Sequence, residues 1–97
     1  MRHTDYEWLV EFENPNGEIM DLDDYPATLT GLRAARASAA DAPDGMIGNV
    51  CLRQVERDDD HVGDYGYAYP DACGRLPVEF EQTRRPVPVR FRTMFAK

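Results

Sequence analysis

The sequence predicts an α+β fold: a small antiparallel sheet in ββαββ order, with one helix packed on one face and a C-terminal tail docked on the body. Three observations indicate it. Apolar and polar residues alternate over residues 6–12, a helix-forming segment follows at 28–41, and alternating segments return at 47–57 and 65–69. At 97 residues the chain has the length of a single domain, 1–97.

Residues 6–22 are predicted to form a β-hairpin. One face of its first strand is apolar: Tyr6, Trp8, Val10 and Phe12. The intervening positions, Leu9 among them, are expected to face water. The sequence Asn14-Pro15-Asn16-Gly17 interrupts the pattern with residues that tolerate positive φ, and the alternation resumes up to Leu22. Trp8 is the only tryptophan, so its large side chain should dominate a small core.

The helix predicted at residues 28–41 has a recognisable start and end. Thr28 can cap its first turn, and several alanines favour the helical conformation. A narrow apolar stripe should face the sheet: Leu29, Leu32, Ala35 and Ala39. Gly31 is expected to weaken the first turn. The turn-forming residues 42–45 then end the helix.

The second half of the chain is predicted to contain two more strands and a tail. A polar turn or longer loop over residues 58–64 separates the strands. The second strand carries a tyrosine face that lies either in the core or in solvent: Tyr65, Tyr67 and Tyr69. Pro77 makes residues 76–80 an edge strand or an irregular docked segment. Residues 89–95 are predicted to be a short helix, with an extended strand as the alternative. The arginines of this tail are expected to pair with acidic residues of the body.

The net charge of −7 is unevenly distributed along the chain. Residues 1–74 carry −11, whereas residues 75–97 carry +4. An acidic body is repelled by phosphates, so direct binding to nucleic acid is not expected, and a basic partner surface is the better match. The alternative is that the charge only keeps the protein soluble. Because no apolar run is long enough to span a bilayer and no apolar leader precedes the first strand, we expect a cytoplasmic protein without membrane contact.

No motif in the sequence predicts catalysis, a metal or a cofactor. An EF-hand loop beginning at Asp58 fails, because its fifth position is Val62 and its twelfth is Tyr69. Cys51 and His61 carry no spacing that indicates a nucleophile and its base. We therefore expect no enzymatic activity, with Cys51 and Cys73 as free thiols in a reducing compartment; a disulfide between them is the alternative.

The predicted partner-binding residues are acidic side chains and the tyrosines beside them. They are Asp21, Asp23, Asp24, Asp58, Asp59, Asp60, Asp64, Tyr65 and Tyr67. Aromatic residues next to acids suit a protein interface, since tyrosine offers a large contact area at low entropic cost. If the tyrosines face solvent, carboxylates spaced along the sheet can imitate a phosphate backbone and occupy a basic groove.

Several fragments carry a family resemblance. They are Tyr6-Glu7-Trp8, Val10-Glu11, Gly17-Glu18-Ile19 with Asp21, Tyr67-Ala68-Tyr69, Gly74-Arg75-Leu76-Pro77 with Phe80, Val87-Pro88 and Phe91. Together these strand and turn patterns resemble small phage and prophage accessory proteins. The resemblance implies a small intracellular phage protein that binds and blocks a host factor, as anti-CRISPR proteins do.

The leading hypothesis is therefore a non-enzymatic, phage-encoded inhibitor. Its partner would be a host protein or ribonucleoprotein complex with a basic surface. One alternative is a small structural or assembly subunit that forms a homodimer through an edge strand. The other is a small metal-binding protein or enzyme.

Overall fold

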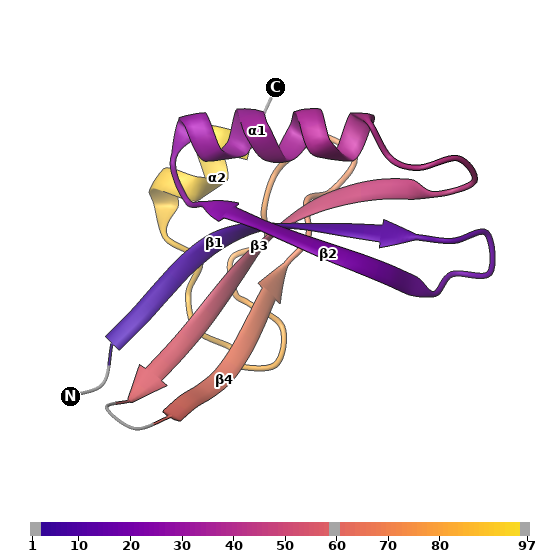
Figure 1. Cartoon of the computed structure of the whole chain (residues 1–97). Helices are drawn as coiled ribbons and strands as arrows, with labels where there is room; N and C mark the ends of the chain where they lie inside the picture. The colour runs from indigo at the N-terminus through magenta and orange to yellow at the C-terminus, as the bar shows by residue number, and fades with distance from the viewer. Residues whose placement is uncertain (1–2, 59–60, 96–97) are drawn as a thin grey trace. The chain divides into compact units, whose positions relative to one another are not determined.

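The computed structural model describes residues 3–58 and 61–95, and it confirms the predicted fold class (Figure 1). The elements are β1 (His3–Glu13), β2 (Ile19–Pro26), α1 (Leu29–Ala40), β3 (Ile47–Asp58), β4 (His61–Ala68) and α2 (Val89–Phe95). The strands form a four-stranded sheet in the order β2-β1-β3-β4, with antiparallel pairing of β1 with β2 and of β3 with β4. The expected ββαββ order is therefore correct, with α2 added in the tail.

The chain divides into two compact units. One unit is Glu7–Cys51, which contains the β1–β2 hairpin and α1 and is called the hairpin–helix unit below. The other combines Met1–Tyr6 with Leu52–Lys97; it contains the β3–β4 hairpin and the C-terminal segment and is called the tail unit. Each unit is described by itself.

The turn of the hairpin–helix unit is built as its sequence predicts. The Asn14 side-chain oxygen accepts hydrogen bonds from the backbone N–H groups of Asn16 and Glu18, both at 3.0 Å. Gly17 has a φ of 84°, a conformation that side chains with a Cβ rarely adopt. β2 continues to Pro26, beyond the predicted end at Leu22, because its residues remain paired with β1.

The core of the hairpin–helix unit is built around β1. The side chains of Trp8, Val10 and Phe12 are buried, as predicted. Leu9 is also buried, at 2% exposure, so the prediction that it faces water is wrong. Cys51, on the same face of the sheet, is fully buried as well. Because β1 is an inner strand, an apolar residue near its middle can be shielded on either face.

Helix α1 is joined to the hairpin by a few specific contacts. The Thr28 hydroxyl accepts a hydrogen bond from the N–H of Gly31 at 3.0 Å, which confirms the predicted cap. The Trp8 indole N–H donates to the Thr28 carbonyl at 3.0 Å. A Cβ on Gly31 would lie 1.8 Å from the Pro26 carbonyl oxygen. Gly31 is therefore required for the close approach of α1 to the end of β2, a role that the sequence pattern did not indicate.

The apolar stripe of α1 is shorter than predicted. Leu32 and Ala35 are fully buried, whereas Ala39 is half-buried and Leu29 is 49% exposed. The helix lies against β2 (Figure 1), and Leu32 and Ala35 are its buried apolar residues. Its small residues allow the chain at Gly48 to come close to Ala39.

The β3–β4 hairpin of the tail unit replaces most of the loop predicted over residues 58–64. β3 runs through Asp58, β4 begins at His61, and these two residues are paired. The turn or loop predicted over residues 58–64 is therefore too long, because Asp58 and residues 61–64 belong to the two strands. Asp59 and Asp60 lie outside the described residues.

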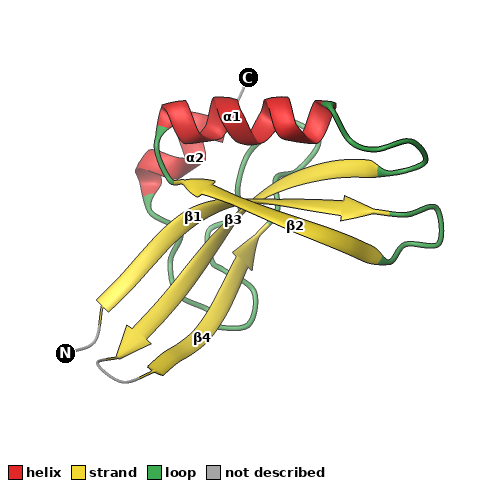
Figure 2. Cartoon of the chain, in the orientation of Figure 1, coloured by secondary structure: helices red, strands yellow, loops and turns green. Residues whose placement is uncertain are grey.

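The C-terminal segment docks on the tail unit largely without regular structure (Figure 2). Residues 76–80 are irregular: Glu79 makes an isolated bridge with Pro86, and Leu76 and Phe80 are buried. The ring of Tyr6 lies 6.0 Å from that of Phe80 and 5.2 Å from that of Phe91, measured between centroids. The docked tail and the short helix α2 are therefore confirmed.

Candidate functional site

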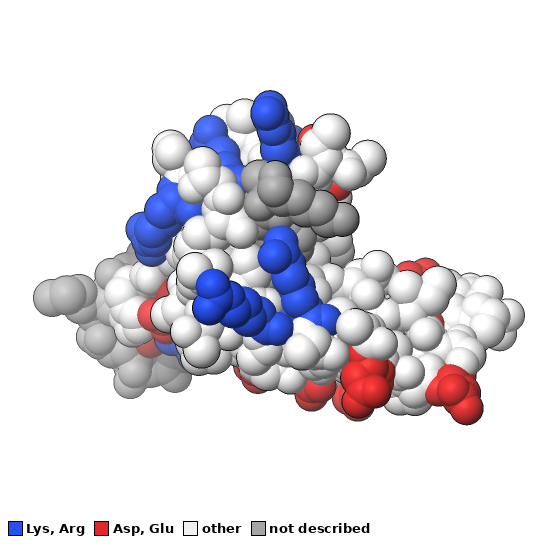
Figure 3. Space-filling view, turned by 90° about the horizontal axis from the view of Figure 1, so that it is seen from above, with Lys and Arg blue, Asp and Glu red and all other residues white. Residues whose placement is uncertain are grey.

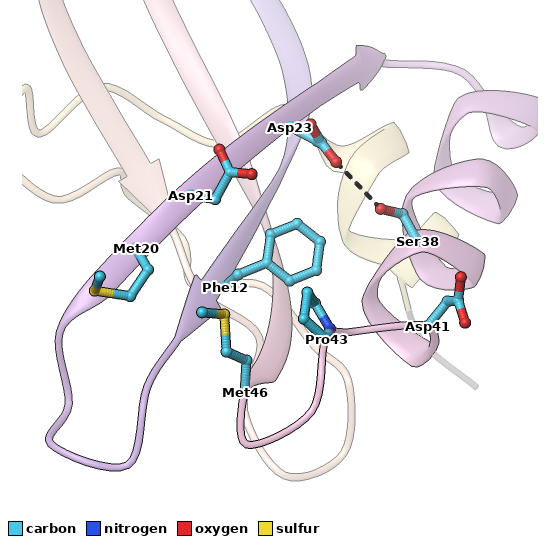
Figure 4. Close-up of a pocket in the computed structure, with 8 residues that line it drawn as sticks. All are labelled: Phe12, Met20, Asp21, Asp23, Ser38, Asp41, Pro43 and Met46. Carbon is cyan, nitrogen blue, oxygen red and sulfur yellow. Dashed lines mark hydrogen bonds between the residues drawn. The ribbon is translucent and has the colours of Figure 1, made fainter.

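A pocket of about 490 Å³ lies in the hairpin–helix unit, between β2 and the end of α1 (Figure 4). Its lining combines apolar and acidic side chains, and none of the eight lining residues is basic. They are Phe12, Met20, Asp21, Asp23, Ser38, Asp41, Pro43 and Met46. It is a concave site with convergent polar groups, and such a site is the usual place for a ligand group to bind.

The register of the hairpin places the strand residues of the pocket. Phe12 is paired with Asp21, and Val10 with Asp23, so both aspartates stand on the face of β2 that bears α1. The register shifts between Phe12 and Glu13, where Met20 has no partner on β1. A bulge of this kind changes the direction of a side chain, and here Met20 joins Asp21 in the pocket lining.

The end of α1 supplies the opposite wall. The backbone N–H of Asp41 donates to the carbonyls of Ala37 and Ser38 and closes the helix. A turn follows in which the N–H of Met46 donates to the Pro43 carbonyl at 2.9 Å. This turn brings the Met46 thioether beside Phe12, as Figure 4 shows.

The chemistry of the pocket favours a group that is both apolar and cationic. Phe12 is buried, with 6% of its surface exposed, and with the thioethers of Met20 and Met46 it offers an apolar floor. Asp21, Asp23 and Asp41 are exposed around it. Asp23 accepts a hydrogen bond from the Ser38 hydroxyl at 3.4 Å, which leaves its carboxylate with further acceptor sites. The long stem and charged head of lysine or arginine match this combination.

The predicted aspartates of β2 are divided between two faces. Asp21 and Asp23 line the pocket, whereas Asp24 is paired with Leu9 and stands on the opposite face of the hairpin. The prediction that all three are contacts remains a prediction. The other lining residues were missed because they converge only in the folded unit; the one indication in the sequence is Asp41 and Pro43, which mark the end of a helix.

The predicted tyrosine face belongs to the tail unit and faces solvent. Tyr65 and Tyr69 are each 41% exposed, and Tyr67 is half-buried. The guanidinium of Arg53 lies 5.3 Å from the centre of the Tyr65 ring, a cation–π distance. The neighbouring Asp64 is exposed. These side chains form an open surface, with a basic residue already beside the aromatic rings.

The acidic residues of the tail unit are largely offset by bases. Asp5 is ion-paired with Arg57 at 2.8 Å, and Glu79 with Arg84 at 3.8 Å. Glu56, which is buried, is ion-paired with Arg85. Over its whole sequence the tail unit has nine acidic and nine basic residues, and so no net charge.

The hairpin–helix unit carries the entire net charge of the protein. It has nine acidic residues and two basic ones, which gives −7. The two basic residues, Arg33 and Arg36, are exposed on α1. Charged side chains of both signs reach the surface, with Lys and Arg in blue and Asp and Glu in red in Figure 3.

Three further findings concern metal ligands, membrane spans and cysteines. Within residues 3–58 and 61–95, no three or more His, Cys, Asp or Glu side chains group as they would around a metal ion. Over the same residues, no helix has both the length and the apolar character to cross a membrane. Both cysteines are free; Cys51 is buried and Cys73 is exposed.

Comparisons of the chain with protein-family models, with curated proteins and with solved structures find no match. The function is therefore inferred from the pocket, the exposed surfaces and the distribution of charge.

Proposed function

We propose that this is a non-enzymatic binding protein whose hairpin–helix unit binds a basic surface of a partner protein or ribonucleoprotein. The observation that supports it is the concentration of the net charge of −7 in Glu7–Cys51. A charge of that size on a small unit attracts a basic partner over about 10 Å at ordinary salt, and it repels nucleic acid.

Carboxylates stand on both faces of the β1–β2 hairpin. Asp21 and Asp23 lie on the pocket face, and Glu11 and Glu13 lie on the other together with Asp24. Spaced along two strands, these negative charges act as a substitute for phosphates in a basic groove. The partner would be held by many charge contacts and by the apolar floor of the pocket.

The proposed biological setting comes from the resemblance to small phage and prophage accessory proteins. In that setting the protein inhibits a host defence complex, for example a CRISPR effector, by occupying a site that otherwise receives nucleic acid or another protein. Inhibition by occupancy needs no catalytic group.

The second candidate function is a structural subunit that pairs with its own copies. It is favoured by the exposed apolar residues of the edge strand β2, of which Ile19 is 46%, Met20 55% and Leu22 48% exposed. A second copy would, however, bring an equal negative charge to the same strand. The basic partner is therefore the better-supported candidate.

The test of the proposed function is capture of a partner from a lysate of a CRISPR-bearing host. The tagged protein is used at about 0.05 M and about 0.5 M salt, after nuclease treatment to remove indirect links through nucleic acid. We expect capture of a nucleic-acid-handling complex at low salt and its loss at high salt. Capture of only the protein's own copies at both concentrations would contradict the proposal and favour the structural subunit.

A cellular control addresses inhibition itself. In the same host, expression of the protein should raise the transformation efficiency of a plasmid that the CRISPR system targets, by about tenfold or more if most of the effector is bound. A plasmid without the target should transform equally well with and without the protein. Equal rescue of both plasmids would argue against a defence-specific inhibitor.

A further inference from the structure

The two edge strands of the sheet differ in how they are covered. On β4, the N–H of Glu81 from the C-terminal segment donates to the Tyr67 carbonyl at 2.9 Å, so that edge has a bridging chain. The other edge strand, β2, is packed by α1 on one face and carries three exposed apolar residues. Exposed apolar residues on an edge strand favour the addition of a further strand.

One backbone amide of β2 faces the open side of this edge strand. The N–H of Leu22 donates to the side-chain carboxylate of Asp21 at 2.9 Å rather than to the ladder with β1. In an antiparallel ladder, alternate residues direct their N–H and C=O groups away from the neighbouring strand. Leu22 is therefore a residue whose amide faces the open side of β2, and Asp21 holds that amide in the absence of another acceptor.

Building on the proposed function, we propose that β2 binds an extended basic segment of the partner as an added strand, with one lysine or arginine of that segment in the pocket. A backbone carbonyl of the segment takes the N–H of Leu22. The carboxylate of Asp21, released from that amide, then pairs with the basic side chain.

The pocket is suited to the basic side chain of such a segment. Beyond Asp21, the pocket lining continues with Asp23 and Asp41, which would lie on either side of the basic group of the segment. Phe12 would contact the aliphatic stem of the same side chain. The last turn of α1 has no basic residue, so the partial negative charge of its carbonyl end is not offset from within the helix. A lysine or arginine near Asp41 would offset it.

Charge excludes a second copy of the chain as the preferred occupant. Pairing of two β2 strands would place the aspartates of one copy against those of the other: Asp21, Asp23 and Asp24. Like charges directly opposite each other on neighbouring strands are destabilising. A segment that alternates basic and apolar residues meets no such repulsion and covers Met20 and Leu22 at the same time.

The test uses a synthetic peptide of about ten residues in which Lys and Val alternate, and the same peptide methylated on every amide nitrogen. The two peptides carry the same charges and side chains, but only the first can donate backbone hydrogen bonds. We expect the methylated peptide to bind about tenfold or more weakly by calorimetry, since two or three backbone hydrogen bonds are lost. Amide shifts in NMR spectra should be largest in β2.

A matching test removes a backbone amide from the protein instead of from the peptide. Leu22→Pro removes an amide that faces away from β1, so the β1–β2 ladder should survive, while Leu22→Thr removes the same side chain and keeps the amide. Leu22→Pro should weaken binding of the unmethylated peptide by about tenfold, and Leu22→Thr by about threefold or less. If Leu22→Pro fails to fold, the comparison of the two peptides still decides the matter.

The outcomes separate this inference from the proposed function. Equal binding of both peptides, lost at high salt, would overturn strand addition and leave an acidic protein that attracts basic partners. Binding of neither peptide would also overturn strand addition, while the capture experiment above decides the proposed function independently. Weaker binding of the methylated peptide, with NMR shifts confined to β2, would support both strand addition and the proposed function.

Discussion

The two compact units have the same number of acidic residues, nine each, but they differ in how those acids are surrounded. In the tail unit nine basic residues offset them, and even the buried carboxylate of Glu56 has Arg85 as its ion-pair partner. In the hairpin–helix unit only Arg33 and Arg36 oppose them, and both lie exposed on α1. The charges of the tail unit therefore balance, whereas the hairpin–helix unit carries a net negative charge.

This difference changes how the charge of the sequence is interpreted. Divided along the chain, residues 1–74 are acidic and 75–97 basic. Divided by compact unit, the bases of the C-terminal segment fall in the same unit as Asp58, Asp59, Asp60 and Asp64, and that unit has no net charge. The aspartates of β2 lie in an acidic one and are the better candidates for attracting a basic partner.

The largest effect should come from the core of the hairpin–helix unit. Trp8→Ala removes a fully buried side chain and its hydrogen bond to Thr28, and should lower the free energy of unfolding by about 3–5 kcal/mol. Trp8→Phe keeps much of the volume and should cost less. Urea unfolding followed by circular dichroism measures both. Equal stability of Trp8→Ala and the wild type would show that the unit is not organised around this residue.

The same substitution made in each unit should sharpen the comparison. A Cβ on Gly31 would lie 1.8 Å from the backbone of Pro26, whereas the three atoms nearest to a Cβ on Gly66 are side-chain atoms of Thr83, Gln54 and Phe80, at 2.7–2.9 Å. Because the overlap at Gly31 is deeper and involves backbone, Gly31→Ala should destabilise by about 2–3 kcal/mol and Gly66→Ala by about 1–2 kcal/mol. Thermal unfolding of the two variants measures this, and the opposite order would be inconsistent with the described packing.

The ion pairs of the tail unit should contribute to the free energy of unfolding according to how deeply they are buried. Arg85→Ala leaves the carboxylate of Glu56, of which only 7% is exposed, without its partner, and should cost about 1–3 kcal/mol. Arg84→Ala breaks an exposed pair with Glu79 and should cost about 0–1 kcal/mol. Chemical denaturation measures both variants. Similar costs would indicate that the docked tail is not held by the buried pair.

The smallest effect concerns pH. The side chain of Asp71 accepts hydrogen bonds from the backbone N–H groups of Arg75 and Cys73, both at 2.9 Å, and these bonds hold the pKa of Asp71 below its ordinary value. A lowered folded-state pKa stabilises the fold above about pH 4 and loses that contribution as the pH falls through the folded value. The stability difference between the wild type and Asp71→Ala should therefore shrink on acidification. A difference independent of pH would contradict this.

Much of the fold follows from local patterns. The alternation around Trp8 predicts β1, Asn16-Gly17 predicts the turn, and Thr28 predicts the start of α1, because each depends on neighbours in the sequence. The burial of Leu9 and the requirement for Gly31 depend instead on which elements pack together. Local pattern does not contain that information.

In the candidate site, too, some features follow from the sequence and others depend on tertiary packing. Asp21 and Asp23 were predicted to be partner contacts because of their charge, and the structure places both in the pocket. Asp41, Ser38 and Met46 join them only because α1 folds back over β2, and a register shift directs Met20 to the same place. The composition indicates the charge of the site, whereas its shape depends on tertiary contacts.

The most direct test of the account compares two charge-matched triple variants in binding the alternating Lys–Val peptide at about 0.1 M salt. One variant carries Asp→Asn at 21, 23 and 24 of the hairpin–helix unit; the other carries Asp→Asn at 58, 59 and 60 of the tail unit. Both lose three negative charges, so a difference between them reports position rather than net charge. We expect the first to lower affinity by about tenfold or more and the second by about twofold or less. A larger loss in the second variant would place the contact surface beside the tyrosines and contradict the account.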